Sequence, residues 1–575
     1  MPVPKRGEFM KNWKRLCGLL SAAALCMSLL AGCGEESGVL SLTVCAGGAP
    51  EDLDPIYAAS ASDQTILEHL YENLMRVTTD VSGDVTVTNG MAKSVDQEEN
   101  HDGTVTYTFR LRSAKWSDGR AVKADDFVYA WQRLADPANA SPYASILSMV
   151  AGYDTVRATG DVTALQVTAK NDSTLEVVLD GHYDWFLPQV CTSPATMPVR
   201  RDILEKWKAD HAPEEPESES EDETVEPAPA QPAEPWWSDV EKLVTNGPYQ
   251  VAAAAGEGLT LAVREDYSGS HVGPTKLTFR YAASREEAWT LYQNKEVDFV
   301  WALPEEQLAL EAEDETWSPA PELATTTVLF NCAAEPFTDP LIRRALGLAV
   351  DREALAEALG VTARPAEGLI PPGISDGDDD FRTDSVLLDN DPEQYDIRCG
   401  QARDLLDQAG WDSGADLGIL EYIYVDSAGG AAVAQLLAEQ WRGVLGVEVA
   451  LRPVTAEELS AALRSGEYTM AAADLRAVAA DAECFLSVWE SGSSENVIAY
   501  ENSAYDTLIS IIARADDGTA RMGCLHDAEE LLLADMPLVP LYTRVADWEL
   551  RGTYTGVCRD SRGWFSFLNV APWTA

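Results

Sequence analysis

Strand-like and helical segments are mixed along the whole chain, and this mixture restricts the fold more than any other feature. Residues 40–46 alternate apolar and polar side chains, as a strand entering a sheet does. Similar strand-like segments recur at residues 104–111, 173–179 and 259–263. Helical periodicity appears at residues 64–76, 124–134, 343–358, 400–409, 431–445 and 528–534. The intermixing favours an α/β class, and the chain shows no internal repeat.

Length and charge limit the functions that the chain can have. It has 575 residues with 46% hydrophobic content, which at about 100–200 residues per domain indicates two to four domains. The 42 basic and 95 acidic side chains give a formal net charge of −53. Such a surface repels nucleic-acid phosphates and anionic lipid, so a DNA- or RNA-binding role is excluded.

The N-terminus has the features of an export signal. Five basic side chains precede an apolar run, Leu16–Leu30, which is shorter than the ~20 residues that span a bilayer as a helix. Leu30-Ala31-Gly32-Cys33 resembles the lipobox of bacterial lipoproteins, in which the cysteine is diacylated and becomes the new N-terminus. We therefore expect a signal peptide at residues 1–32, lipid attachment at Cys33 and a tether at 33–39. Translation starts at Met1 or at Met10.

No motif points to catalysis, a cofactor or a metal. The chain lacks a phosphate-binding loop, a nucleophile elbow and a zinc-binding His-Glu-x-x-His, and its cysteines after Cys33 have no metal-ligand spacing. His69 is expected to be a helix-surface or satisfied core histidine. The acidic run at 376–380 could coordinate calcium, but it lacks the EF-hand spacing, so we expect a solvated loop. The chain is not expected to be an enzyme.

One acidic segment breaks the alternation of strands and helices. Residues 212–235 are nearly all Glu, Pro, Ser, Ala and Thr, and Val225 is the single large aliphatic side chain among them. Low hydrophobicity and like-charge repulsion cannot offset the entropy of ordering, so residues 213–235 are expected to be a disordered surface insertion. A partner-binding tail is the alternative. Trp236 and Trp237 are expected to re-enter the folded body.

Several blocks resemble one family, the peptide-type solute-binding lipoproteins of bacterial ABC importers. The resemblance runs in order from about residue 40 to the end, with the acidic segment as an insertion. The matching blocks are Asp52-Leu53-Asp54-Pro55, Leu70-Tyr71-Glu72-Asn73-Leu74, residues 107–119, residues 124–144, Asn246-Gly247-Pro248-Tyr249, Glu296-Val297-Asp298, Phe330-Asn331, residues 336–352, Pro371-Pro372-Gly373 and Ala409-Gly410-Trp411.

The resemblance implies a two-lobed, periplasmic-binding-protein-like α/β fold with a strand hinge and an additional domain, the three-domain type that binds peptides. Lobe one would comprise residues 40–72, 199–329 and 545–575. The additional domain would be 73–198 and lobe two 330–544, so the hinge crossings would lie near 330 and 545. Such proteins bury a peptide between the lobes and pair its backbone with sheet edges.

The ligand anchor of the family is where this chain departs from the pattern. The family holds the ligand's ammonium with an aspartate in a Trp-x-x-Asp-Tyr run, and a gapless count back from Phe485-Leu486 puts Leu475 at the Trp and Val478 at the Asp. A buried ammonium without a partner would cost several kcal/mol. Either Asp474 or Asp481 substitutes, or the ligand is blocked, cyclic or not a peptide.

The resemblance also indicates other cleft residues. Arg476 could grip a carboxylate or phosphate in bidentate fashion, or it could be a rim arginine paired with local acids. Tyr143 matches a cleft-lining tyrosine, and Trp301 falls where cleft side chains leave lobe one, unless it is a core residue. Ala59 and Ala61 would leave room for the ligand on the first strand–helix connection.

These observations predict a monomeric, lipid-anchored receptor outside the cytoplasm that captures peptides or peptide-like solutes and delivers them to an ABC permease. One alternative keeps the fold and changes the ligand to a metal chelate, haem, sugar or opine. Another is a sensor or adhesin that has dropped transport.

Overall fold

The computed structural model describes residues 40–573 except 46, 80–84, 184, 212–234, 270–272, 302, 312–320, 377–378, 384, 478–479, 494, 514, 516–517 and 561. The predicted signal peptide, Cys33, the tether, the acidic insertion up to residue 234 and Val478 lie outside this part of the chain. None of the helices in the described part has the length and hydropathy that a bilayer crossing requires.

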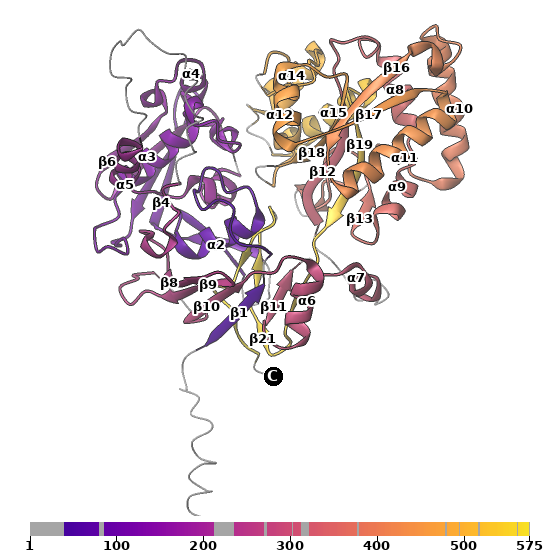
Figure 1. The fold of residues 1–575 in the computed structure, drawn as a ribbon. Helices are drawn as coiled ribbons and strands as arrows, with labels where there is room; N and C mark the ends of the chain where they lie inside the picture. Colours follow the sequence, from indigo (N-terminus) through magenta and orange to yellow (C-terminus); the bar gives the residue numbers. More distant parts are fainter. Residues whose placement is uncertain are drawn as a thin grey trace, which may run out of the picture.

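A six-stranded mixed sheet forms the base of the molecule and corresponds to lobe one (Figure 1). β1 runs parallel to β10 and β11, whereas β9 and β20 are antiparallel to their neighbours. In sheet order the strands are β20 (Trp548–Leu550), β11 (Phe299–Trp301), β1 (Ser41–Cys45), β10 (Lys276–Arg280), β9 (Gly258–Val263) and β8 (Tyr249–Ala255). The predicted strands at 40–46 and 259–263 are therefore confirmed, and they lie in one sheet.

A second six-stranded sheet forms lobe two. β12 is antiparallel to both β18 and β19, and β16 is parallel to β17 and β18. In sheet order the strands are β13 (Ala363–Pro365), β19 (Leu538–Val545), β12 (Pro321–Phe330), β18 (Met470–Arg476), β16 (Ile419–Val425) and β17 (Glu448–Val454). Its helices are α8 (Pro340–Leu348), α9 (Arg352–Leu359), α10 (Tyr395–Gln408), α11 (Ala428–Leu445), α12 (Ala456–Ser465), α13 (Glu483–Leu486), α14 (Ser503–Ile512) and α15 (Gly518–Asp535).

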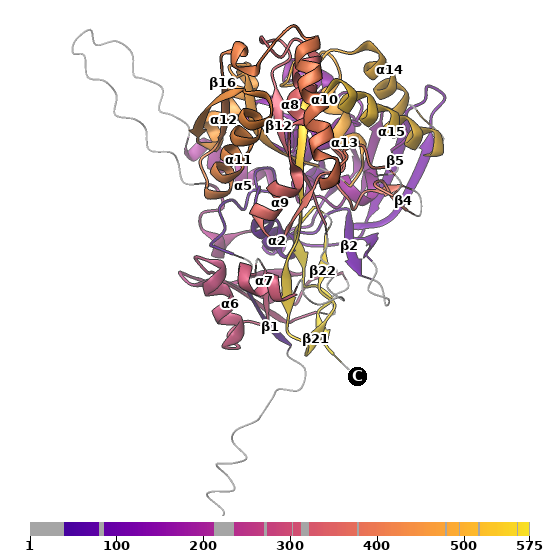
Figure 2. The ribbon, with the colours of Figure 1, turned by 90° about the vertical axis from the view of Figure 1, so that its right-hand side faces the viewer.

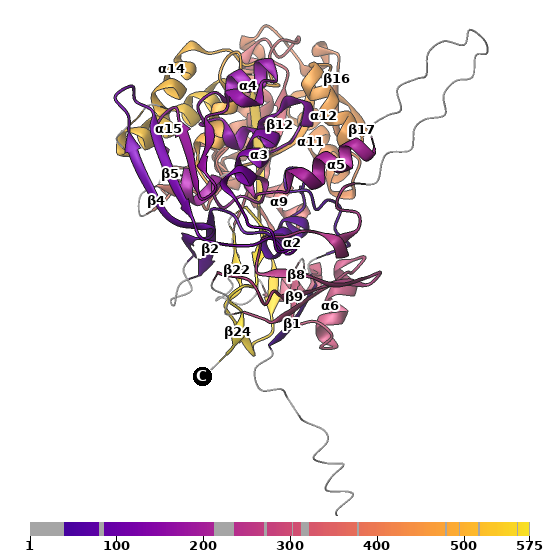
Figure 3. The same cartoon turned by 90° about the vertical axis from the view of Figure 1, so that its left-hand side faces the viewer.

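A four-stranded antiparallel sheet with its helices forms the additional domain, which Figure 3 shows facing the viewer. The strands are β4 (Ala92–Glu99), β5 (Val105–Leu111), β7 (Thr174–Leu179) and β6 (Val167–Asn171), and the helices are α3 (Ala124–Ala135) and α4 (Tyr153–Thr159). α5 (Arg201–Asp210) follows on the same side (Figure 3). The predicted strands at 104–111 and 173–179 and the helix at 124–134 are confirmed.

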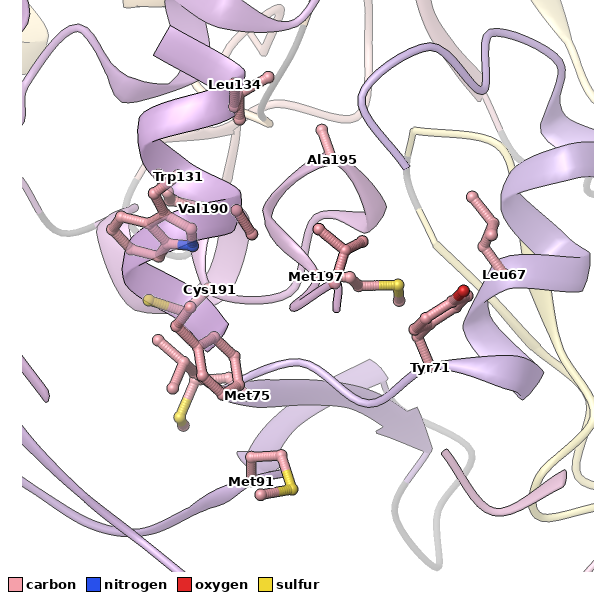
Figure 4. Close-up of a cluster of buried hydrophobic side chains, with 14 of the residues drawn as sticks. Leu67, Tyr71, Met75, Met91, Trp131, Leu134, Val190, Cys191, Ala195 and Met197 are labelled. Carbon is pink, nitrogen blue, oxygen red and sulfur yellow. The ribbon is translucent and has the colours of Figure 1, made fainter. Parts of the chain in front are cut away.

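The additional domain and lobe one share a hydrophobic core (Figure 4). Trp131 of α3 is fully buried, and its indole N–H donates to the Thr196 carbonyl at 3.0 Å. Tyr71 and Leu67, at the end of α2 (Ala61–Leu70), lie across from Met197 in this cluster. A continuous core of this kind resists movement between the two parts, so they form one half of the molecule.

Short elements complete the described fold. They are β2 (Met75–Thr79) with β3 (Val85–Asn89), β14 (Ser375–Asp376) with β15 (Asp379–Asp380), β21 (Tyr554–Thr555) with β24 (Ala571–Pro572), β22 (Cys558–Arg559) with β23 (Phe565–Ser566), α6 (Arg285–Gln293) and α7 (Glu305–Glu311). β14 and β15 occupy the acidic run in which we expected a loop.

Two helix predictions are wrong in their extent. The helix predicted at 64–76 is α2, which ends at Leu70 because Tyr71 is extended and Met75 already begins β2. The helix predicted at 343–358 is two helices, α8 and α9. Asp351 interrupts the periodicity, and its carboxylate accepts from the Ala354 amide to cap α9.

Two strand connections join the lobes. β11 belongs to the first sheet and β12 to the second, so the chain crosses between Trp301 and Pro321 rather than near residue 330. The second crossing joins β19 to β20 through Ala546 and Asp547 alone, next to the expected position at 545. In Figure 1 the yellow strand that leaves lobe two runs down toward the base, and Figure 2 shows the same segment after a quarter turn. A two-residue crossing such as Ala546-Asp547 can absorb a hinge rotation.

The motif around Trp116 is part of the scaffold. Trp116 is fully buried, and Gly119 adopts a φ of 88°, a left-handed conformation that favours glycine. The Asp126 carboxylate accepts from the Trp116 indole at 3.1 Å and from the Lys123 amide at 2.8 Å, which caps α3.

Candidate ligand cavity between the lobes

A cavity of about 310 Å³ lies where the two lobes, the additional domain and the hinge meet. Small and aromatic side chains make up one part of its wall, and charged side chains the other. Its walls are formed by Ala59, Ser60, Ala61, Gln64, Tyr143, Ser193, Trp301, Glu322, Arg476, Ala477, Ala546, Asp547, Arg559, Arg562, Gly563, Trp564 and Phe565. This volume is at the lower end of the range for small-molecule sites, about 300–1,000 Å³.

The cavity brings together five of the side chains that the sequence indicated. Ala59, Ala61, Tyr143 and Trp301 reach it from the first half of the molecule, and Arg476 reaches it from β18 of lobe two. Their positions in the sequence span more than 400 residues, so only the folded arrangement of the two halves places them around one space.

The other predicted site residues lie elsewhere. Asp474 and Leu475 line a second cavity in lobe two, and Val478 is outside the described residues. Asp481 lines neither of these cavities. Its carboxylate accepts from the Arg521 guanidinium at 2.9 and 3.1 Å and from the Glu483 amide at 2.9 Å. With these partners Asp481 is poorly placed to replace the missing ammonium anchor.

The start of α2 shapes the first wall of the cavity. Ser60 caps the helix by accepting from the Asp63 amide at 3.0 Å, which leaves the small side chains of Ala59 and Ala61 facing the space. The Tyr143 hydroxyl donates to the Ala58 carbonyl and accepts from the Gln64 amide, both at 3.0 Å. Burial raises the pKa of Tyr143, and Arg476 across the cavity opposes that rise.

The C-terminal wall of the cavity, formed by residues 562–565, is fastened to α2 by Thr65 and His69. The His69 ring is fully buried, with Nδ1 2.7 Å from the Thr65 carbonyl, and its Nε2 accepts from the Phe567 amide at 3.0 Å. The Thr65 hydroxyl accepts from the Phe565 amide at 3.0 Å. His69 is therefore a satisfied core histidine, one of the two expected roles, and it holds Trp564 and Phe565 against the cavity.

Three arginines reach the cavity, and they differ in how their charges are balanced. Arg562 is buried and forms an ion pair with Asp560 at 2.7 Å, with further bonds to Thr192 and to the Gln189 carbonyl. Arg476 is half exposed and lies 3.6 Å from Glu322. The contact with Glu322 agrees with the second of the two predicted roles, a rim arginine paired with a local acid. Arg476 also lines the cavity, so the first role, binding of an anionic ligand, stays open.

Arg559 lies near Arg476 in the same cavity. Its Nε is buried and has no hydrogen-bond partner in the described part of the chain, and its Nη1 is 3.4 Å from the Pro321 carbonyl. Burial lowers the pKa of Arg559; Glu322 opposes this, whereas Arg476 lowers it further. Two guanidinium groups that disfavour each other are stabilised by an anion bound between them.

Two carboxylates partly balance this positive charge. Glu322 stands at the start of β12, and Asp547 lies at the second crossing, where it accepts a hydrogen bond from the Leu303 amide. Burial raises the pKa of Asp547. A ligand in this cavity therefore meets cationic groups and carboxylates within one small space, as a zwitterion or a peptide end would require.

The sequence reasoning missed Glu322, Asp547, Arg559 and Trp564. Asp547 follows directly after the crossing expected at 545, and hinge residues face an interlobe cleft, so this residue could have been found. Arg559 and Arg562 form a local cluster of positive charge in a strongly acidic chain. That cluster was the available signal for the C-terminal wall.

The two halves also touch away from the hinge. A side chain at Gly181 in the additional domain would come within 3.0 Å of the Ala513 carbonyl in lobe two. The pKa of Tyr183 is raised by burial, then by Asp180 and by Glu483 of lobe two. The two halves therefore come close at this point as well as at the hinge.

A family model described as bacterial extracellular solute-binding proteins, family 5 middle, matches residues 86–496, more than half of the chain. The chain belongs to this family. The peptide-type resemblance seen in the sequence and the mixed α/β architecture are confirmed.

Curated relatives of this family 5 protein match it over most of their length. It is 29% identical over 501 residues to the probable deoxycholate-binding periplasmic protein YgiS of Escherichia coli, with 86% of each chain covered. It is 29% identical over 530 residues to the periplasmic oligopeptide-binding protein OppA of Escherichia coli, with 89% of each covered. The dipeptide-binding protein DppE of Bacillus subtilis is 25% identical over 554 residues, 93% of this chain and 94% of DppE.

Solved structures agree with these relatives. OppA of Burkholderia pseudomallei superposes with a TM-score of 0.70 at 27% identity, covering 90% of this family 5 protein and 96% of that chain. OppA of Haemophilus influenzae in complex with RPPGFSPFR superposes with a TM-score of 0.71 at 25% identity, covering 93% and 99%.

Proposed function

We propose that this family 5 protein is a lipid-anchored receptor outside the cytoplasm, which captures a peptide or peptide-like solute between its lobes and delivers it to an ABC permease. The observation that carries the proposal is the cavity whose walls come from both halves and the hinge. Opening and closing of the halves would give the permease two states to distinguish. The relatives named oligopeptide- and dipeptide-binding proteins support the ligand class.

The edge of β18 supports binding of an extended backbone. β18 pairs with β12 along its whole length, but its pairing with β16 is limited to Met470 and Ala471. From Ala472 to Arg476 no strand of the described chain pairs with the other edge. A peptide added there would gain main-chain hydrogen bonds without any reading of its side chains.

A non-peptide solute in the same cavity is the second candidate. Two observations favour it: the family's ammonium-binding aspartate is replaced by Val478, and the YgiS relative is named a probable deoxycholate-binding protein. Native mass spectrometry of protein purified without denaturation separates the two candidates. Heterogeneous peptide masses would support the first, and one defined small mass would support the second.

We expect Arg476→Ala to weaken binding of an anionic ligand at least tenfold, because the ligand loses a charge-assisted hydrogen bond. The matched control is Arg452→Ala, which removes an arginine that pairs with Glu421 on the exposed face of lobe two. Calorimetry with the co-purified ligand measures both variants. An unchanged affinity for Arg476→Ala would show that the anion is held elsewhere.

We expect Cys33→Ser to release the protein from membranes, because serine has no thiol to acylate. Fractionation of cells that produce the variant, compared with wild type, measures the distribution between membrane and soluble fractions. If the variant still fractionates with membranes to the wild-type extent, lipid attachment at Cys33 is refuted.

A further inference from the structure

A second cavity of about 310 Å³ lies in lobe two, directly beside the interlobe cavity. Arg476 lines both, so this residue stands at their junction. The wall of the second cavity is mainly apolar, with Leu329, Leu475, Phe485, Val488, Trp489 and Val497. Asp474 and Glu495, both exposed, are its acidic members. α12 and β18 face the additional domain across the molecule in Figure 1.

The wall of this second cavity is held from behind by ion pairs. Arg521 of α15 binds Asp481 at 2.9 Å and Glu483 at 2.7 Å, which fixes the segment that carries Phe485 and Trp489. Phe485 is 2% exposed and packs into the core of lobe two. The apolar wall is therefore built before a ligand arrives, which reduces the ordering entropy that binding would cost.

One polar group in this wall lacks a partner. Trp489 is 2% exposed, and within the described residues its indole N–H makes no hydrogen bond. An indole nitrogen can only donate, and a buried donor without an acceptor destabilises the protein.

We propose that the second cavity is a subsite for a large apolar group that stands next to a free carboxylate of the ligand. The carboxylate would bind Arg476 at the junction, with Arg559 behind it, and the apolar group would fill the space against Leu475, Val488 and Trp489. The inference rests on the proposed capture of peptide-like solutes. It specifies their end: a free carboxyl terminus whose last residue is large and apolar.

The proposal combines a carboxylate with an apolar group because Arg476 lines both cavities. A carboxylate bound at the junction leaves the next substituent within reach of the second cavity, and in a C-terminal residue both groups leave the same carbon atom. The count back from Phe485-Leu486 places Val478 where the resemblance expects the ammonium-binding aspartate, so we take the carboxylate end as the charged end that the cavity recognises. Burial of an aromatic ring against apolar side chains then adds affinity.

Calorimetry with three acetylated tripeptides tests the subsite: alanyl-alanyl-phenylalanine, its C-terminal amide, and trialanine. We expect the phenylalanine peptide with a free carboxylate to bind at least tenfold more tightly than trialanine, and at least tenfold more tightly than its amide. The acetyl group removes any contribution from an ammonium group.

Two variants that fill the cavity locate the apolar group. Val488→Trp and Val497→Trp should each remove most of the preference for phenylalanine while the affinity for trialanine and the melting temperature stay near wild type. Ile419→Trp is the matched control, because Ile419 is 76% exposed at the start of β16 and lines neither cavity. It should leave all three affinities unchanged.

The outcomes separate the two proposals. If trialanine and the phenylalanine peptide bind equally well, the subsite is refuted and peptide capture stands. If the preference survives in both filled variants, the apolar group binds elsewhere and the subsite is likewise refuted. If none of the three peptides binds, peptide capture and the subsite fail together.

Discussion

Replacing Glu529 by alanine is expected to lower the free energy of unfolding by about 3–5 kcal/mol, because it leaves a buried arginine without its counter-ion. Glu529 is fully buried on α15, and one of its carboxylate oxygens accepts from Arg382, whose side chain is 5% exposed. The other oxygen accepts from the amides of Leu369 and Ile370 at 2.7 and 2.9 Å. One carboxylate thus ties the Pro371-Pro372-Gly373 loop to the helix.

The packing around this pair leaves little room for repair. A Cβ at Gly368 would lie 2.1 Å from an Arg382 nitrogen and 2.6 Å from a Glu529 oxygen, so the backbone approaches the ion pair closely. Chemical denaturation monitored by tryptophan fluorescence measures the loss. Glu421→Ala is the matched control: its pair with Arg452 is about half exposed, so we expect a loss of less than about 1 kcal/mol. Equal losses in the two variants would contradict the argument.

Replacing Glu68 by glutamine is expected to stabilise the protein at high pH by about 5 kcal/mol and to have little effect in acid. Glu68 is buried on α2, and burial raises its pKa to about 8, with Arg76 opposing the rise and Asp560 adding to it. The folded state therefore holds the proton more tightly than the unfolded state does. Between about pH 4.5 and pH 8 the wild type loses stability as pH rises, at about 1.4 kcal/mol per pH unit.

Glutamine cannot ionise, so the variant lacks this part of the pH dependence. The difference in free energy of unfolding between variant and wild type should be near zero at pH 4.5, grow up to pH 8 and stay constant above it. Denaturation at a series of pH values measures it, with Glu98→Gln on the exposed face of β4 as the control. A difference that does not change with pH would show that Glu68 is ionised throughout this range in the folded protein.

Local patterns predicted most individual elements well. The alternation at 104–111 and 173–179 gave strands β5 and β7, and the periodicity at 124–134 gave α3, because each pattern reflects which face an element buries. The errors occurred where contacts with a distant segment determine the end of an element. α2 stops at Leu70 although apolar residues continue, because the following residues pair as β2 with β3.

The sequence predicted some of the cavity residues and missed others. The predicted residues lie in short blocks of sequence, whereas the missed ones reach the cavity through contacts between distant segments. Ala59, Ala61, Tyr143, Trp301 and Arg476 were indicated by family blocks, each of which lies within a short stretch of sequence. Arg559 and Trp564 belong to the C-terminal segment, and they reach the cavity only because Thr65 and His69 hold that segment against α2. No short-range pattern reports such a contact.

The sequence by itself determined the α/β class and the family, since these depend on periodicity and on ordered blocks of residues. Only the tertiary structure decided that Asp481 pairs with Arg521, that Arg559 lies beside Arg476, and that an apolar cavity adjoins Arg476. Charges and apolar side chains from distant segments acquire partners only when the lobes are folded and closed. The chemistry of the cavity is therefore a property of the packing rather than of any one segment.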